Sequence, residues 1–360
     1  MHLAANRRVI AMVGAMVLLP VPVALMSTQS AQAACPGGLW QNVRYVDGTT
    51  WLDWEMPPQP PGGTDIVANA GVGTGDSFTI HVDVANSSGI WDNVQYESGV
   101  NSGNWQGWEQ PTQPSGKIES LADAAEPDGS MQLLAVTSTG LWHDIRYPNG
   151  GWQGWRQPAQ PPGDMQDIGM YPVMTGMDNG DMVTVIGFPG GMFYADIRFA
   201  SGAWSGWQLL PAVPGVGSDM TISGDRNGDV QMMAINAAPN ANAQVYHNIW
   251  HYDLPHGASF QGWEEPTQPP DGGWSRLLTA VTTPDGNTQF VDLVNDPNVN
   301  KGDGLLYGDI RYTDGSWQGW HAIPSPTAGV SIGNFPVAAP TWVDFPADEV
   351  WADPPVFCNS

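Results

Sequence analysis

Hydrophobic and polar positions alternate in short runs along most of the chain, and no segment shows convincing helical periodicity. The segment Phe78–Val84 places an apolar residue at every second position, which is the pattern of a half-buried β-strand. Similar segments follow at Leu133–Thr137, Met182–Phe188, Val230–Ala237 and Gln289–Val294. Turn-forming residues such as Pro, Asp, Asn and Gly introduce each of these four. The pattern predicts an all-β protein of short antiparallel strands.

A longer motif recurs six times with a period near 51 residues. Its three clearest copies are Gly38–Tyr45, Gly89–Tyr96 and Gly140–Tyr147, and three looser copies are Phe193–Phe199, Val245–His251 and Leu306–Tyr312. One longer insertion, around residues 295–303, precedes the last copy. Six copies of one motif indicate a repeat architecture, in which each repeat is one structural unit.

A second aromatic signature follows each motif after a turn. In the third repeat the turn Asn149-Gly150 leads to Trp152 and Trp155, and Asn-Gly suits the positive φ angles of a tight hairpin. The corresponding pairs elsewhere are Trp51/Trp54, Trp105/Trp108, Trp204/Trp207, Phe260/Trp263 and Trp317/Trp320. Four short strands per repeat of this length predict one blade of a β-propeller.

The two ends of the chain are expected to share the first blade. The first motif begins at the third strand of a blade, so the first two strands must come from the tail, where Val330–Trp342 and Glu349–Phe357 are short apolar segments. Cys35 and Cys358 then fall at the same junction, where a disulfide would join them. We therefore predict a six-bladed propeller of four-stranded antiparallel blades over residues 34–360, with the first blade completed by the C-terminal tail.

The first 33 residues have the features of an export signal. Arg7 and Arg8 precede an apolar stretch over 9–26 and an Ala31-Gln32-Ala33 cleavage pattern. The mature chain should therefore be secreted and extracellular, without insertion into a membrane. A formal net charge of −25 makes nucleic acid a poor partner.

Four of the 11 basic residues occupy one position of the repeated motif. They are Arg44, Arg146, Arg198 and Arg311. An acid or amide lies two residues earlier on the same face, as Asp144 does before Arg146. Two interpretations stay open: these groups pair across a groove between blades, or they bind the hydroxyl groups of a sugar.

The paired tryptophans also have two interpretations. In the first, they bind a ligand, because tryptophan faces stack on sugar rings. The candidate binding residues are then Trp105, Trp108, Trp152, Trp155, Trp317 and Trp320. The same side chains are also typical of the packing between blades. Residues three apart on a regular strand point to opposite sides, so at least one member of each pair is expected to be structural.

No pattern predicts a catalytic residue, a cofactor or a metal site. His247 and His251 are close in sequence, but on a strand they would lie about 13 Å apart. The segment Asp225–Asp229 lacks the later bidentate acid of an EF-hand calcium loop. The common serine-hydrolase elbow and zinc-protease motifs are missing as well.

The unit Leu-Trp-x-Asp-Ile-Arg-Tyr-x-x-Gly-x-Trp-x-x-Trp resembles the blades of tectonin-type and fucose-binding β-propeller lectins. That resemblance implies sugar pockets between adjacent blades, formed by arginine, acid and aromatic groups, and a glycan or glycosylated surface as partner. We thus expect a non-enzymatic carbohydrate-binding protein of unspecified oligomeric state. Two alternatives remain: an extracellular hydrolase of glycans or lactones with carboxylates at the channel mouth, and a protein-interaction scaffold.

Overall fold

The structure is a computed structural model that describes residues 39–45, 54, 56–63, 67–74, 79–96, 103–163, 170–225, 227–236, 243–252, 259–270, 274–283, 285–295, 304–323 and 347–352. Every regular element named within these ranges is a β-strand. In chain order they are β1 (Trp40–Tyr45), β2 (Ala68–Thr74), β3 (Thr79–Asn86), β4 (Gly89–Tyr96), β5 (Ile118–Ala125), β6 (Met131–Thr137), β7 (Gly140–Arg146), β8 (Met170–Gly176), β9 (Met182–Phe188), β10 (Met192–Arg198), β11 (Gln208–Leu209), β12 (Gly217–Gly224), β13 (Asp229–Asn236), β14 (Gln244–His251), β15 (Ser259–Phe260), β16 (Trp274–Thr282), β17 (Thr288–Asn295), β18 (Gly304–Arg311), β19 (His321–Ala322) and β20 (Ala347–Ala352).

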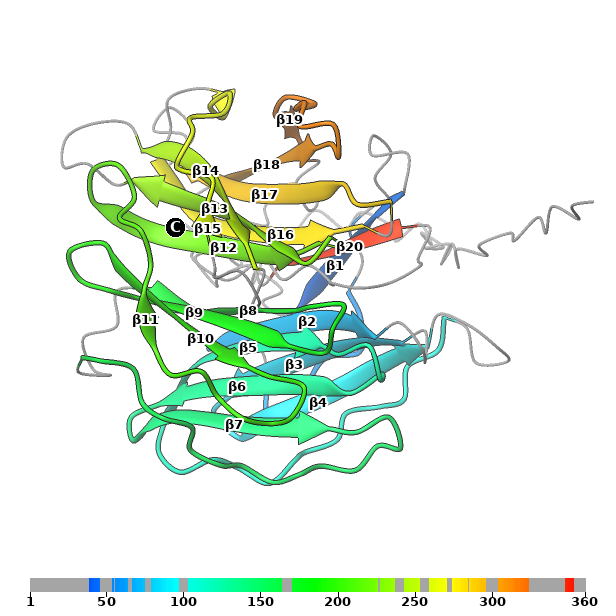
Figure 1. The fold of residues 1–360 in the computed structure, drawn as a ribbon. Coiled ribbons are helices and arrows are strands. Elements are labelled where there is room, and N and C mark those ends of the chain that lie inside the picture. The colour runs from blue at the N-terminus through cyan, green and yellow to red at the C-terminus, as the bar shows by residue number, and fades with distance from the viewer. Residues whose placement is uncertain are drawn as a thin grey trace, which may run out of the picture.

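The strands form antiparallel sheets that succeed one another around a β-propeller (Figure 1). Five blades contain three or four strands: β2–β4, β5–β7, β8–β11, β12–β15 and β16–β19. Their first strands contact one another in chain order, β2 against β5, β5 against β8, β8 against β12 and β12 against β16. The first strand of each blade is therefore the innermost one, and the motif strand lies further out.

The strands predicted from alternation are confirmed with small shifts of their ends. Met182–Phe188 has the predicted bounds, and the predicted Phe78–Val84 corresponds to β3. These strands are buried on both faces, because each blade packs between two others. The six copies of the longer motif are β1, β4, β7, β10, β14 and β18.

The prediction of six four-stranded blades is wrong in its count for the described residues. They form five blades and one two-stranded sheet, in which β1 pairs with β20 from Trp40 opposite Ala352 to Tyr45 opposite Ala347 (Figure 1). The second tail strand was predicted at Glu349–Phe357, so β20 begins earlier in the chain. Of the tail segment Val330–Trp342, no residue lies within the described ranges.

The fourth strand of each blade is also shorter than predicted. It has two residues in β11, β15 and β19, and in the blades β2–β4 and β5–β7 only isolated bridges remain. A bulge and several prolines interrupt this outer segment, and proline cannot donate a backbone hydrogen bond to a ladder.

The hydrophobic core lies between blades. One cluster joins Ala68, Val72 and Ile90 of blade β2–β4 to Leu121 and Leu133 of the next blade. Similar clusters join β5–β7 to β8–β11, β8–β11 to β12–β15, and β12–β15 to β16–β19. Burial of apolar surface between blades therefore holds the ring together.

Several predictions about the ends of the chain fall outside the described residues. The export signal over 1–33, Cys35 and Cys358 are among them. Pairing of β1 with β20 does bring the two ends of the chain to one sheet, as the predicted disulfide requires. In the described part of the chain, no helix is long and apolar enough to span a membrane.

Candidate binding grooves between the blades

The second tryptophan of each pair fastens one blade to the previous one. Its indole Nε1 donates a hydrogen bond to a backbone carbonyl in the proline-rich segment of that blade. The pairs with their N–O distances are Trp108 to Pro58 (2.9 Å), Trp207 to Ala159 (2.7 Å), Trp263 to Pro211 (3.3 Å) and Trp320 to Thr267 (2.7 Å), and Trp155 donates likewise to Thr112. The structural interpretation therefore accounts for Trp108, Trp155 and Trp320.

Both tryptophans of a pair lie on the same side of their blade, contrary to the expectation from strand alternation. Trp152 and Trp155 pack against one core cluster, shared with the previous blade. Arg146 bridges to Trp152 and His143 bridges to Arg156. His143 and Arg146 are three positions apart on β7, but their partners are four positions apart on the outer segment. This one-residue bulge shifts the alternation, so that Trp155 turns to the side of Trp152.

The glycine of Trp-Gln-Gly-Trp forms this bulge. Gly154 has a φ angle of 89°, a conformation in which residues with a Cβ are strained. Its backbone N–H donates to Oδ1 of Asp144 at 2.8 Å. The glycine at this position is therefore required by the backbone conformation of the bulge.

The acid or amide two residues before the arginine position thus holds the bulge and does not pair with the arginine. Gly107 donates to Asn93 at 3.0 Å, Gly262 to Asn248 at 2.9 Å and Gly319 to Asp309 at 2.9 Å. Burial raises the pKa of Asp144 and of Asp196 above the ordinary value. An acceptor at this position is needed in every described blade, whereas a negative charge is not.

A glutamine clamp replaces part of the missing fourth strand. The side chain of Gln160 accepts from the N–H of Leu141 at 2.7 Å and donates to the carbonyl of the same residue at 3.2 Å. Gln59, Gln113 and Gln268 clamp Leu39, Ile90 and Val245 in the same way. The sequence signal for this clamp was the repeated Pro-x-Gln-Pro, which the motif analysis missed.

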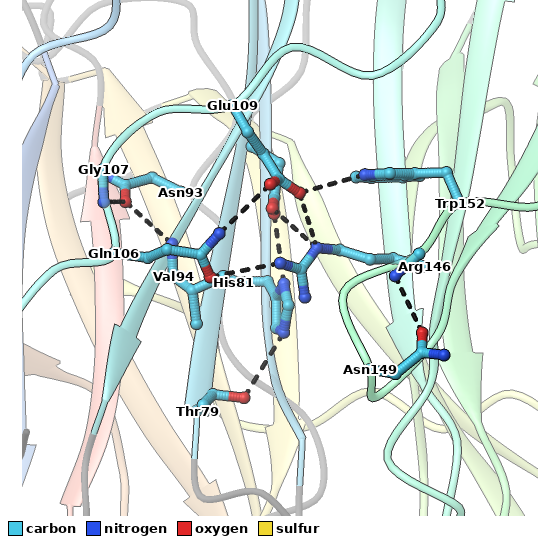
Figure 2. A network of polar contacts seen from close by, with 12 residues as sticks. Thr79, His81, Asn93, Val94, Gln106, Gly107, Glu109, Arg146, Asn149 and Trp152 are labelled. Atoms are coloured by element: carbon cyan, nitrogen blue, oxygen red, sulfur yellow. Dashed lines mark hydrogen bonds and ion pairs between the residues drawn. The ribbon is translucent and has the colours of Figure 1, made fainter.

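The groove between blades β2–β4 and β5–β7 contains the densest polar network (Figure 2). Arg146, at the end of β7, crosses to the preceding blade, where its Nε lies 3.0 Å from Oδ2 of Asp92 and 3.1 Å from Oε1 of Glu109. Trp152 Nε1 donates to the same Glu109 oxygen at 3.1 Å, and Arg146 Nη2 donates to Oε1 of Gln106 at 3.3 Å. We call these five residues the Arg146 groove.

The polar groups of the Arg146 groove differ in their access to solvent. The side chain of Glu109 is 34% exposed and that of Arg146 is 8% exposed, while Asp92 is fully buried. The guanidinium carbon of Arg146 lies 6.0 Å from the ring centroid of Trp152. A ligand would therefore meet the glutamate, the glutamine and the indole first, with the arginine behind them.

Buried acids surround the inner end of the Arg146 groove. Nδ1 of His81 lies 3.2 Å from Oδ1 of Asp92. Burial, with repulsion from Asp92, raises the pKa values of Asp83 and Asp123 well above the ordinary range. Arg146 is the cation that lowers the pKa of Asp83, so the arginine compensates buried negative charge as well as lining the groove.

The same arrangement recurs between blades β12–β15 and β16–β19. Glu264 occupies the place of Glu109, Trp317 that of Trp152 and Arg311 that of Arg146. Here Nδ1 of His247 lies 3.0 Å from Oε1 of Glu264, and His247 also packs edge-on against Trp317 with ring centroids 5.2 Å apart. Arg311 Nε is buried without a hydrogen-bond partner, so this groove keeps a free donor.

A further groove, between blades β8–β11 and β12–β15, is apolar. Trp250 takes the arginine position and stacks on Phe260 at a centroid distance of 5.4 Å and an interplanar angle of 24°. These rings belong to the hydrophobic cluster between the two blades. The fifth repeat therefore departs from the polar pattern of the other grooves.

Known structures share this architecture, although no protein family and no curated protein matches the chain. AofleA from Arthrobotrys oligospora, as a triple arginine-to-alanine mutant, aligns over 80% of each chain with a TM-score of 0.54 and 14% identity. The BP39L lectin from Burkholderia pseudomallei aligns over 86% of each chain, also with a TM-score of 0.54 and 14% identity. The chain has the fold of the fucose-binding β-propeller lectins. A mutant Aleuria aurantia lectin in complex with α-methyl-L-fucoside aligns with a TM-score of 0.50 and 11% identity, over 77% of this chain and 83% of that one.

The remaining predicted residues of this propeller occupy equivalent positions. Trp105 bridges to Gln95, and Trp317 bridges to Arg311. Arg198 ends β10 and bridges to Trp204, while Arg44 lies on β1 opposite Asp348. Arg146 and Trp152 thus contact the previous blade, and the bridges place Arg198, Arg311, Trp204 and Trp317 at the equivalent backbone positions of their own blades.

Metal binding finds no support in the described residues. They contain no group of three or more His, Cys, Asp or Glu side chains arranged for a metal ion. In the segment considered as a calcium loop, Oδ1 of Asp225 accepts from the backbone of Asn227 and of Asp229, at 2.8 and 3.0 Å. His251 lies 3.0 Å from Asp229, whereas His247 bonds to Glu264 and Gln231.

Proposed function

We propose that this protein is a secreted, non-enzymatic lectin that binds carbohydrate in grooves between adjacent blades. The observation that supports the proposal is the Arg146 groove, where an arginine and an indole from one blade meet a glutamate from the previous blade. A carboxylate accepts from sugar hydroxyls, a guanidinium donates to them, and an indole face packs on the ring.

Repetition of the groove supports the same proposal. Glu264, Arg311 and Trp317 repeat the three residue types in a second place on the ring. Several weak sites on one rigid ring would gain avidity on a glycosylated surface. Closure of a sixth blade by the two chain ends, beyond the pairing of β1 with β20, is part of this proposal.

A hydrolase is the less favoured candidate. Asp83 and Asp123 do have raised pKa values, as an acid catalyst requires. However, Asp83 has no exposed surface, and in the half-buried Asp123 the carboxyl oxygen Oδ2 is buried. A group that is buried in this way cannot contact a glycan, so its raised pKa follows from burial inside the interface between blades.

Calorimetry with α-methyl-L-fucoside tests the proposal, since the mutant Aleuria aurantia lectin, which has the same fold, forms a complex with that sugar. Glu109→Gln and Trp152→Phe should each weaken binding by about tenfold or more, because a hydrogen bond to a charged group contributes roughly 1.5–3 kcal/mol. Arg146 is unsuitable as the test position, because its removal leaves Asp92 buried without its cation and would destabilise the fold.

Asp128→Asn is the matched control for Glu109→Gln. It removes one acidic charge from a hairpin turn and keeps the oxygen that accepts from Ser130. This variant should bind as the unchanged protein does. If neither the fucoside nor any glycan on an array binds the folded protein, the proposed function is wrong.

A further inference from the structure

The groove between blades β5–β7 and β8–β11 carries an arginine where the Arg146 groove carries Glu109. In each blade the residue directly after the aromatic residue of the motif pairs with one residue of the outer segment. These outer-segment partners occupy equivalent places in their grooves. Three of these pairs are Asp92–Glu109, His247–Glu264 and His143–Arg156. The rim position is thus acidic in two grooves and cationic in this one.

A second arginine faces the same groove from the next blade. Arg198 ends β10 as Arg146 ends β7, and each forms a bridge to the first tryptophan of its pair. That tryptophan, Trp204, packs edge-on against His143 of the preceding blade, with ring centroids 5.4 Å apart. The charges of Arg156 and Arg198 both act on the ring of His143, and Nη2 of Arg198 lies near Gly202 in the turn of its own blade.

The electrostatics of His143 agree with two cations in one groove. Burial, followed by the charges of Arg198 and Arg156, lowers the pKa of His143 to about 3. The ring is therefore neutral at pH 7, and its Nε2 lies 2.7 Å from Oε1 of Gln132. The positive potential of the groove comes from the two arginines alone.

The acids close to Arg198 include Glu126 and, beside it, Asp181. Burial raises the pKa of Glu126 to about 8, so that this carboxyl is largely protonated at pH 7 even with Arg198 nearby. Asp181 accepts hydrogen bonds from the N–H of Ala200 at 2.8 Å and the hydroxyl of Tyr252 at 2.9 Å. Among the described residues, neither Arg156 nor Arg198 forms an ion pair within 4 Å.

Two arginines that form no ion pair with any described residue are unusual in one groove of a chain with 11 basic and 36 acidic residues. We propose that Arg156, Arg198 and Trp204 form a site for a carboxylate-bearing sugar, such as a uronic acid residue. Guanidinium groups bind carboxylates through paired hydrogen bonds, and the partly exposed Trp204 offers an apolar face for the ring. This inference rests on the proposed carbohydrate binding and gives this groove a different ligand from the Arg146 groove.

Binding of trigalacturonic acid and of its methyl ester to the full chain tests the site. The two probes have the same rings, and the ester lacks the charge. The acid should bind at least about tenfold more tightly than the ester, with affinity that falls as salt is added. Arg156→Glu, which introduces the residue type found at Glu109, should weaken binding of the acid by at least about tenfold.

A charge-matched control keeps the assay specific. Lys117 is exposed and lies outside the groove, so Lys117→Glu, which changes the net charge by the same amount as Arg156→Glu, should leave binding of the acid unchanged. Thermal unfolding of Arg156→Glu should match that of the unchanged protein, because Arg156 is an exposed side chain without an ion pair in the described structure.

The outcomes separate this inference from the proposed function. Fucoside binding without binding of the acid would overturn the carboxylate site and leave the lectin function standing. The site is also wrong if the acid binds equally well to Arg156→Glu, or if a sulfated disaccharide binds and the acid does not. Absence of binding by every sugar would overturn both.

Discussion

The hydrogen bond from the N–H of Gly154 to Asp144 stabilises the bulge of the outer segment, and substitution of Asp144 tests this most directly. Its Oδ1 accepts from the N–H of Ile145 at 2.7 Å and of Gly154 at 2.8 Å, while Oδ2 is buried without a hydrogen-bond partner. Asn93 and Asn248 do the same in two other blades, each with its Nδ2 buried and unpartnered. We therefore predict that Asp144→Asn folds as well as the unchanged protein, whereas Asp144→Ala does not.

The expected sizes follow from these contacts. Asp144→Ala leaves the N–H of Gly154 without its acceptor, and a buried unsatisfied donor costs about 1–3 kcal/mol. Asp144→Asn keeps the acceptor and removes a carboxylate whose pKa is raised by burial above the ordinary 3.8. An acid with a raised folded pKa stabilises the fold fully below its unfolded pKa and loses this contribution as pH rises. The stability of the asparagine variant relative to the unchanged protein should therefore improve from about pH 4 upward.

Urea unfolding at pH 4 and pH 7 measures both variants. The midpoint of Asp144→Ala should fall at both pH values with an unchanged m-value. The midpoint of Asp144→Asn should stay level or rise at pH 7. Equal destabilisation by the two substitutions would refute the assignment of the side-chain oxygen as a bulge acceptor, as would an alanine variant with full stability.

Three more predictions concern stability. Gln160→Met removes the clamp amide at similar volume and should lower the free energy of unfolding by about 1–3 kcal/mol in urea, whereas Gln157→Met, which loses one exposed hydrogen bond, should lower it less. Burial raises the pKa of Glu126 from 4.5 to about 8, so the stabilising contribution of this group is lost as pH rises between these values. The thermal midpoint of the unchanged protein should therefore decline over this pH range, and Glu126→Gln should make the decline smaller. A decline of the same size in the variant would contradict this. Peptide mapping without reduction should recover Cys35 linked to Cys358, and loss of the link should cost on the order of 5 kcal/mol; two free thiols in the native protein would exclude it.

The strands could be predicted from the sequence because alternation of apolar and polar residues is a property of each short segment. Alternation and flanking turns gave Met182–Phe188 its observed bounds. The outer segment could not be predicted in the same way, since its path depends on a bulge at glycines such as Gly154 and on the clamp from Gln160. These contacts join residues 10 and 19 positions apart, where strand periodicity carries no information.

The position of Arg146 between two blades was predicted, but the acid that it pairs with was not. The sequence singled out Arg146 and placed it in a groove between blades, yet it assigned the neighbouring Asp144 as its acid. The structure pairs it with Glu109, 37 residues earlier and on the previous blade. Which residues face one another across two blades follows from the ring, and it cannot be read from one strand. The sequence did contain one indication of this partner. Glu109 and Glu264 both directly follow the tryptophan that ends the second aromatic signature.

The repeats divide into positions that hold the ring and positions that are free to differ. The second tryptophan donates across each of the five described interfaces, so its role is the same in every blade. At the groove positions the residue types change instead, from Glu109 with Arg146 to Arg156 with Arg198. Where Trp250 replaces the arginine, stacked rings fill the groove. Since adhesion between blades does not depend on the groove residues alone, one ring can carry acidic, cationic and closed grooves, and we expect the proposed sugar sites to differ in ligand as well as in affinity.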